Sequence, residues 1–293
     1  MSAISATRIL SSGKPYLLYG TAWKEGETAR LVNEAIKSGF RFIDTACQPK
    51  HYNEPGVGEG IVSAMKELGL SRSDLFIQTK FTSLNGQDPN RVPYDKDASV
   101  EDQVYQSIEE SLKNLRTEYI DSFVLHSPMR NHEETMRVWR VLEEKVDNGV
   151  IRQLGISNCY DIHHFEKIHD DARIKPAVLQ NRFYSDSGFD VDLRKYCADN
   201  AIRYQSFWTL TSSTTRRNLQ KLEVKQMAED KGLTPQTLMY VYMMELGHTP
   251  LSGTTNREHM LSDVAVMERI QAGETILSEE ELDQMSHLLE IES

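Results

Sequence analysis

The sequence has few cysteines and no long apolar segment. Its three cysteines, Cys47, Cys159 and Cys197, are too few for a disulfide framework and lack the spacing of a zinc site. Reduced thiols in a reducing, cytoplasmic compartment are therefore expected. No apolar run approaches the ~18 residues that a membrane span needs. The first ten residues, MSAISATRIL, also lack the basic start and long apolar run of a secretory signal.

The sequence also lacks an excess of positive charge. The 33 Lys and Arg residues are outnumbered by 44 Asp and Glu residues, giving a net charge of −11. Nucleic acids and anionic membranes are usually bound through a basic face, so neither is expected as a partner. A dinucleotide needs only a few local cations and stays compatible. We expect a small-molecule partner and a monomer or weak homo-oligomer.

A metal site is not indicated either. His163, His164 and His169 lie close together in the sequence. None of them is paired at the i,i+4 spacing with which a helix presents two histidines to zinc. A solvated helix explains them better, and no bound metal is expected.

What recurs instead is a short apolar, β-branched run followed by an amphipathic stretch. The chain of 293 residues is long enough for one large α/β barrel, and no low-complexity linker divides it. A single domain over residues 1–293 is therefore expected. The predicted strands cover residues 16–21, 41–44, 75–79, 122–125, 151–156, 177–180, 202–207 and 249–252.

The intervening stretches have the period of helices. Apolar residues recur at three-to-four spacing over 104–115, and Ser99 with Asp102 predicts the N-terminal cap of that helix. Similar stripes cover 136–146 and 31–36. Strands that alternate with helices form a parallel sheet, either closed as a barrel or open and doubly wound. The count of eight strands, the chain length and the polar residues after the strands favour a single-domain (β/α)8 TIM barrel.

Four polar side chains stand at or near successive strand ends. Asp44 ends FIDTA, Lys80 ends IQTK, His126 follows FVL, and Tyr52 lies in the loop after the second strand. A tyrosine has a pKa near ~10, and a lysine beside it is expected to lower that pKa by stabilising the phenolate. Each residue alone has an ordinary structural explanation, such as a helix cap or a core histidine. Together they predict a proton-transfer site.

At these strand ends the sequence resembles the aldo-keto reductases. The resemblance extends over nearly the whole chain, from GTAW at 20–23 to the last helix. The resemblance implies hydride transfer from NADPH to an aldehyde or ketone. It also implies a catalytic tetrad of Asp44, Tyr52, Lys80 and His126, with Tyr52 as the proton donor. Trp23 matches the family's first pocket tryptophan, and we expect His51 and Phe81 to line the substrate pocket as well.

The resemblance also implies residues that hold the cofactor. GISN at 155–158 is similar to the family's clamp on the nicotinamide carboxamide, and YQSFWTL is similar to the segment that stacks on the nicotinamide ring. SGTTNREHMLSD is similar to the adenosine-phosphate loop. The expected cofactor-binding residues are Ser157, Asn158, Gln180, Phe207, Trp208, Arg216, Arg217, Gly253, Thr254, Thr255, Arg257 and Asp263.

The sequence departs from the family pattern around the proton donor. The interval from Asp44 to Tyr52 is longer than is usual in the family, and Tyr52 directly precedes Asn53-Glu54. Strict alignment on Asn53-Glu54 places His51 at the tyrosine's position. We favour Tyr52, because a phenol supplies the acid that this mechanism uses.

A second departure concerns cofactor choice. The lysine and serine usual at the 2′-phosphate site are replaced by Gly253 and Thr254, and a later arginine by His259. Arg257 stands in the same loop, and charge-assisted bonds from arginine suit a phosphate. NADPH is therefore expected as the preferred cofactor by a modest margin, with NADH as an alternative.

Two other functions remain as alternatives. Some barrels of this family associate with other proteins and turn over slowly, so a cofactor-binding regulatory barrel is the main one. A metal-dependent hydrolase would need clustered His and carboxylate ligands, which the sequence lacks. The intact tetrad favours an NAD(P)H-dependent carbonyl reductase.

Overall fold

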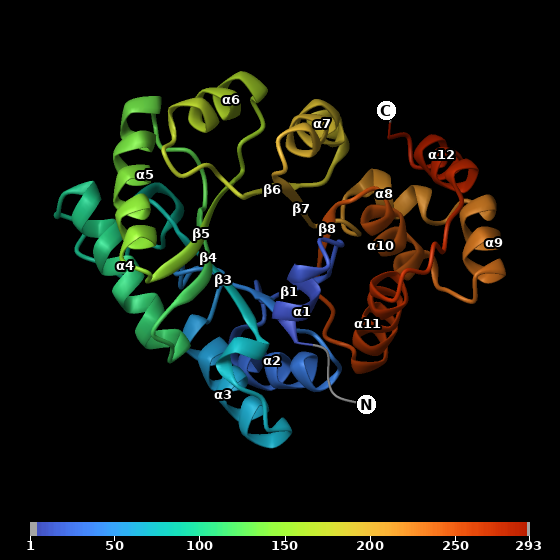
Figure 1. Cartoon of the computed structure of the whole chain (residues 1–293), viewed down its shortest axis with the longest axis horizontal. Coiled ribbons are helices and arrows are strands. Elements are labelled where there is room, and N and C mark those ends of the chain that lie inside the picture. The colour runs from blue at the N-terminus through green and yellow to red at the C-terminus, as the bar shows by residue number, and fades with distance from the viewer. Residues whose placement is uncertain (1–4, 292–293) are drawn as a thin grey trace.

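Eight parallel strands form a closed barrel, and helices surround it (Figure 1). The structure is a computed structural model that describes residues 5–291. The strands follow chain order around the barrel, and the pairing of the first strand with the last closes the ring. They are β1 (Leu18–Gly20), β2 (Phe42–Asp44), β3 (Phe76–Phe81), β4 (Ile120–Leu125), β5 (Ile151–Ser157), β6 (Val178–Arg182), β7 (Arg203–Phe207) and β8 (Thr249–Ser252).

The helices fill the connections between the strands. The outer ring contains α2 (Thr28–Lys37), α3 (Glu54–Leu68), α4 (Val100–Leu115), α5 (His132–Asp147), α6 (Ile162–Asp171), α7 (Val191–Asp199), α10 (Pro235–Glu245) and α11 (Arg257–Gln271). Additional helices are α1 (Ala6–Ser11), α8 (Ser213–Asn218), α9 (Leu222–Asp230) and α12 (Glu279–Leu288). The short 3₁₀ helices are Glu25–Glu27, Arg72–Asp74, Leu84–Gly86 and Ser185–Asp190.

The predicted (β/α)8 barrel is confirmed. Every predicted strand forms, and its observed ends lie within two residues of the predicted ones. The open, doubly wound alternative is excluded because β1 pairs with β8. The cap predicted for α4 is present as well, since the Ser99 side chain accepts a hydrogen bond from the backbone N–H of Asp102.

The alternation of side chains along each strand places the polar residues inside the barrel. Phe42 packs against Tyr16 with ring centroids 3.8 Å apart, and Asp44 lies two residues further along β2. In β3, Gln78 and Lys80 share one face because side chains two positions apart point the same way. The barrel interior is thus aromatic near the start of the strands and polar near their C-terminal ends, where the site lies.

The end of α2 depends on a glycine. Gly39 has a φ of +112°, a conformation that side chains with a Cβ rarely adopt. A Cβ there would also lie 2.7 Å from a methyl group of Val264 in α11. The close approach of α2 to α11 therefore requires glycine at this position.

Within residues 5–291, no helix combines the length and the apolar composition that crossing a membrane requires.

A buried histidine near β8 makes the stability depend on pH. His248 is 8% exposed, and its Nε2 lies 3.2 Å from a guanidinium nitrogen of Arg194. Burial, with the Arg194 charge, lowers the pKa of His248 to about 3. The unfolded chain takes up a proton below its ordinary pKa of ~6.5, whereas the folded chain does not. This contribution to stability is therefore present above pH ~6.5 and is lost as the pH falls from there toward 3.

We expect the free energy of unfolding of the wild type to fall by about 2 kcal/mol between pH 7 and pH 5 because of His248. The control is His248→Gln, because glutamine cannot be protonated. Its free energy of unfolding should fall by about 2 kcal/mol less than that of the wild type over the same pH interval. Urea unfolding of both proteins at the two pH values measures the difference. Identical pH dependence in the two proteins would contradict the assignment.

Candidate active site

A cavity of about 730 Å³ opens at the C-terminal ends of the strands. This is the end at which the active sites of such barrels lie. The predicted site residues that line it are Trp23, Asp44, His51, Tyr52, His126, Ser157, Asn158, Gln180, Phe207, Trp208, Gly253, Thr254, Thr255 and Asp263. Lys80, Phe81, Arg216, Arg217 and Arg257 do not line it.

Lys80 forms a buried ion pair with Asp44 inside the barrel. Its side chain is 0% exposed, and Nζ donates to Oδ2 of Asp44 at 2.7 Å and to the carbonyl of Thr45 at 2.8 Å. Burial lowers the pKa of Lys80, and the adjacent Asp44 carboxylate opposes that effect. A buried charge persists only when it is paired in this way.

Tyr52 lines the cavity beside this ion pair. The Lys80 ammonium is 5.3 Å from the centroid of the Tyr52 ring, and the ring of His126 packs edge-on at 6.0 Å. Burial, with the Asp44 carboxylate, raises the pKa of Tyr52. Burial and the Asp44 charge therefore outweigh the lowering that was expected from Lys80. Tyr52 is a protonated phenol at neutral pH.

His51 takes a different position from its neighbour. Its ring packs on the indole of Trp23 with centroids 3.9 Å apart, at the wall of the cavity. Burial and the nearby Lys50 charge lower the pKa of His51. The two candidate donors thus differ in setting, since Tyr52 lies against the ion pair and His51 lies against a tryptophan.

His126 follows β4 and faces the cavity. Its Nδ1 lies 2.6 Å from the hydroxyl of Thr82, which leaves Nε2 for a ligand. Burial, together with the charge of Lys80, lowers the pKa of His126 to about 3. The imidazole is neutral at physiological pH. Phe81, predicted as a pocket residue, is fully buried behind the wall, because its side chain packs against Tyr94.

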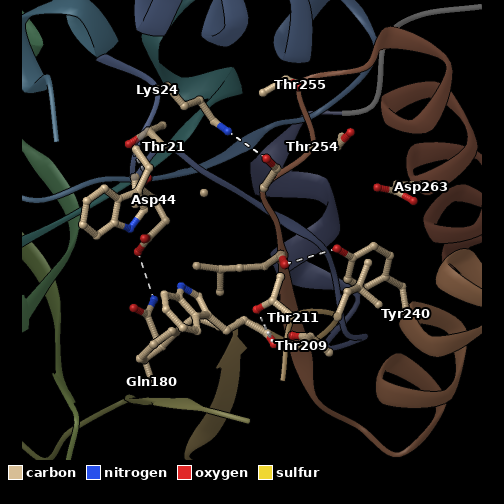
Figure 2. Close-up of a pocket in the computed structure, with 18 of the residues that line it drawn as sticks. Thr21, Lys24, Asp44, Gln180, Thr209, Thr211, Tyr240, Thr254, Thr255 and Asp263 are labelled. Carbon is tan, nitrogen blue, oxygen red and sulfur yellow. Dashed lines mark hydrogen bonds between the residues drawn. The ribbon is translucent and has the colours of Figure 1, made fainter. Parts of the chain in front are cut away.

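The three side chains predicted to clamp the nicotinamide, Ser157, Asn158 and Gln180, all line the cavity. Ser157 donates to the carbonyl of Gln180, and Asn158 donates to the carbonyl of His126. Both hydrogen bonds fix side chains at the cavity wall. The amide nitrogen of Gln180 donates to Asp44 at 2.9 Å (Figure 2). The oxygen of Gln180 is therefore the atom left for a ligand.

Phe207 and Trp208 lie at the end of β7, and both line the cavity. Trp208 has a φ of +56° and is 45% exposed. The guanidinium of Arg182 lies over its indole, 4.3 Å from the ring. Both aromatic side chains therefore border the cavity, and Arg182 covers one face of the Trp208 indole.

The segment after β8 is held in place by a lysine that the sequence interpretation missed. Lys24 donates from Nζ to the carbonyl of Gly253 at 2.8 Å (Figure 2). The Tyr19 hydroxyl donates to the carbonyl of Thr254. Burial lowers the pKa of Lys24 to about 8. Asp263 also borders this part of the cavity, and burial raises its pKa to about 7. The sequence shows only that Lys24 directly follows Trp23 in GTAWK, which gives no sign of its contact with Gly253.

Three predicted basic contacts are not at the cavity. Arg217 pairs with Glu290 at 2.7 Å, and Arg216 is exposed on the same short helix. Arg257 begins α11 and pairs with Glu34 of α2 at 2.7 Å. This arrangement does not support the predicted contacts of these arginines with phosphate groups, because their side chains lie away from the cavity.

Other residues that line the cavity were not predicted as site residues, although several lie within the segments that were expected to hold the cofactor. They include Thr21, Gln48, Thr209, Leu210, Thr211, Gln236, Tyr240, His259 and Ser262. For the described part of the chain, no group of three or more His, Cys, Asp or Glu side chains is arranged to hold a metal ion.

Comparison with known proteins agrees with this geometry. Residues 16–290 match the model of the Aldo/keto reductase family. The chain belongs to the aldo/keto reductase family. It is therefore an oxidoreductase of the type that acts on carbonyl and alcohol groups. The resemblance inferred from the strand ends and the enzyme class are both confirmed.

Relatives within the family span most of the chain. An uncharacterized oxidoreductase of Schizosaccharomyces pombe is 30% identical over 244 residues, 83% of this chain and 78% of that protein. An NAD(P)H-dependent D-xylose reductase of Kluyveromyces lactis is 25% identical over 98% of this chain and 94% of its own. The crystal structure of an aldo/keto reductase from Brucella melitensis has a TM-score of 0.75 at 23% identity, covering 93% of this chain and 94% of that one.

Proposed function

We propose that this protein reduces an aldehyde or ketone with NADPH, with Tyr52 as the proton donor. The observation that carries the proposal is the Lys80–Asp44 ion pair, which lies behind Tyr52 and His126 at the wall of the cavity. A protonated phenol and a neutral imidazole side by side suit a substrate oxygen that gains negative charge.

Each residue of the tetrad has its own part in the reaction. The carbonyl oxygen accepts hydrogen bonds from the Tyr52 hydroxyl and from His126 Nε2, and Tyr52 then donates its proton to that oxygen. Lys80 stabilises the phenolate that is left, and Asp44 keeps Lys80 charged. Because the pKa of Tyr52 is raised, the acid is available throughout the neutral range. Alcohol oxidation, which needs the phenolate, is expected to require higher pH.

The cavity residues fit a nicotinamide dinucleotide, which supplies the hydride when bound. Asn158 and Gln180 present amides near Tyr52 and His126, as a carboxamide requires. Phe207 and Trp208 offer faces for stacking. Lys24 is the ammonium group that borders the same cavity beside Gly253. The K. lactis relative, which is named as NAD(P)H-dependent, supports the same cofactor class.

The direct test is cofactor consumption with a panel of aliphatic and aromatic aldehydes, ketones and quinones. Loss of NADPH absorbance should depend on both the protein and the carbonyl compound. NADH in parallel measures the cofactor preference. If the protein binds NADPH and oxidises none of it with any compound, the slow regulatory barrel is the better description.

The buried position of Lys24 gives a pH-dependent prediction for cofactor affinity. Lys24 must be protonated to attract a phosphate, and its pKa in the free protein is about 8. The protonated fraction falls roughly tenfold between pH 7 and pH 9. The Kd for NADPH should therefore rise about tenfold over that interval, as measured by fluorescence titration.

Two variants complete this test. Lys24→Met should bind NADPH more weakly and show a flat pH dependence over the same range. Arg257→Ala should bind within about twofold of the wild type, since Arg257 is paired with Glu34 on the outer surface. Equal weakening of NADH by Lys24→Met would place the contact on the pyrophosphate. A tenfold loss of NADPH affinity in Arg257→Ala would contradict our placement of the cation.

A further inference from the structure

Three glutamine side chains form a hydrogen-bonded layer across the inside of the barrel. Gln78 of β3, Gln180 of β6 and Gln205 of β7 are all at least 98% buried. Gln78 and Gln180 donate to Oε1 of Gln205 at 2.7 and 2.9 Å. Gln205 in turn donates to Oε1 of Gln78 at 3.2 Å. We call these three residues the amide layer.

The amide layer ends on Asp44. Oδ1 of Asp44 accepts hydrogen bonds from Nε2 of Gln78 at 2.8 Å and from Nε2 of Gln180 at 2.9 Å (Figure 2 shows the second). Oδ2 accepts the Lys80 ammonium at 2.7 Å. One carboxylate oxygen is thus held by two amides and the other by the catalytic lysine.

This arrangement is unusual for the inside of such a barrel. Layers of branched apolar side chains normally fill the interior. A buried amide costs free energy unless it is hydrogen-bonded. Here the amide nitrogens of Gln78 and Gln180 are directed at the catalytic carboxylate, and Gln180 also lines the cavity. The layer therefore joins the cavity wall to the ion pair.

We propose that Gln78 and Gln205 are positioning residues for the reaction. They hold the Asp44 carboxylate against Lys80 and fix the amide nitrogen of Gln180, so that its oxygen faces the cavity. The role in turnover rests on the proposed reductase function. The role in holding the ion pair does not, and this lets the two claims fail separately.

The pKa of Lys80 should depend on how the amide layer holds Asp44. The groups that face Lys80 are Asp44 on β2, Tyr52 after β2, Glu54 on α3 and His126 after β4. Burial lowers the pKa of Lys80, and Asp44 gives the largest opposing effect. An Asp44 that has lost a hydrogen bond from the layer is held less firmly, so the pKa of Lys80 should fall.

The test is Gln78→Met, which keeps the side-chain length and removes the amide. The readout is the NMR titration of the Lys80 ¹³Cε resonance in the full chain. Its midpoint should move down by about one pH unit, since a hydrogen bond to a charged group is worth on that order. In the reductase assay, kcat should fall roughly tenfold. The alkaline limb of the pH profile of kcat should move to lower pH, as the Lys80 midpoint does.

Two further variants keep the proposal testable. Gln205→Met has no direct bond to Asp44 and should show a smaller shift of the same sign. It decides the question if Gln78→Met does not fold. Gln153→Met is the control, because Gln153 lies on β5 and bonds Ser122 rather than the layer. It should leave the Lys80 midpoint unchanged.

The outcomes separate the two claims. A Lys80 midpoint in both layer variants equal to that in Gln153→Met would overturn the positioning role, whatever the activity. A wild type that reduces no carbonyl compound would defeat the proposed function, and the NMR titration would still decide whether the layer holds the ion pair.

Discussion

Tyr52→Phe is expected to lower kcat for carbonyl reduction by ~10²–10⁴ while leaving the Kd for NADPH nearly unchanged. The range is that of general-acid catalysis by a positioned side chain. The Tyr52 ring lies 5.3 Å from the Lys80 ammonium, and the raised pKa of Tyr52 keeps the proton in place until the reaction needs it. Phenylalanine preserves the ring packing against His126 and removes only the acid.

His51→Gln is the matched comparison, because strict alignment would make His51 the donor. Its ring packs on Trp23, and burial and Lys50 lower its pKa, so it is neutral at pH 7. We expect His51→Gln to change KM more than kcat, with a much smaller total loss than Tyr52→Phe. Steady-state kinetics of both variants with one small aldehyde decide the matter. If His51→Gln abolishes turnover and Tyr52→Phe does not, Tyr52 is not the donor.

Lys80→Met is expected to be nearly inactive, for two reasons that a third variant separates. Methionine cannot stabilise the phenolate left on Tyr52. It also leaves the buried Asp44 carboxylate without its cation, and breaking a buried pair from one side costs about 3–5 kcal/mol of stability. Urea unfolding and kcat should therefore both change in Lys80→Met.

The double variant Lys80→Met/Asp44→Asn removes both charges of the pair. Its unfolding free energy should recover toward the wild-type value, because no unpaired charge is left. Its kcat should stay as low as that of Lys80→Met, since the phenolate still lacks a partner. Asp44→Asn alone should be milder. Recovery of activity in the double variant would show that Lys80 acts only through folding.

The fold, and the grouping of polar side chains at one end of the barrel, can be predicted from the sequence because their signals are local. Apolar runs at regular intervals define the strands, and the end of a strand is known as soon as the strand is. The C-terminal ends of parallel strands share one end of a barrel, so Asp44, His126 and Ser157 are expected together at that end. The (β/α)8 topology then follows from the alternation of strands and helices.

The direction of a side chain on a loop or helix end is not accessible in the same way. Arg257 is in the right loop, but it begins α11 and pairs with Glu34 of α2. Lys24 follows β1 and reaches Gly253, more than two hundred residues away in the chain. A local sequence pattern cannot predict such a contact, because the contact forms only when β1 and β8 are neighbours in the barrel.

The amide layer shows the same limit inside the barrel. Gln78 and Gln205 each look like an ordinary polar residue within a strand, and β3 and β7 are not neighbours in the sheet. Their hydrogen bonds cross the barrel interior and depend on its closure. The raised pKa of Tyr52 has a similar origin, since burial and Asp44 act on it only in the folded protein.

The measurement that tests the central claim most directly is isotope transfer. The protein is given NADPH carrying deuterium at both C4 positions, together with an unlabelled aldehyde from the panel, and the alcohol is analysed by mass spectrometry and NMR. Our account predicts one deuterium on the carbinol carbon of the product, and almost none of this product with Tyr52→Phe. An alcohol without deuterium, or no alcohol from any aldehyde while NADPH is bound, would contradict it.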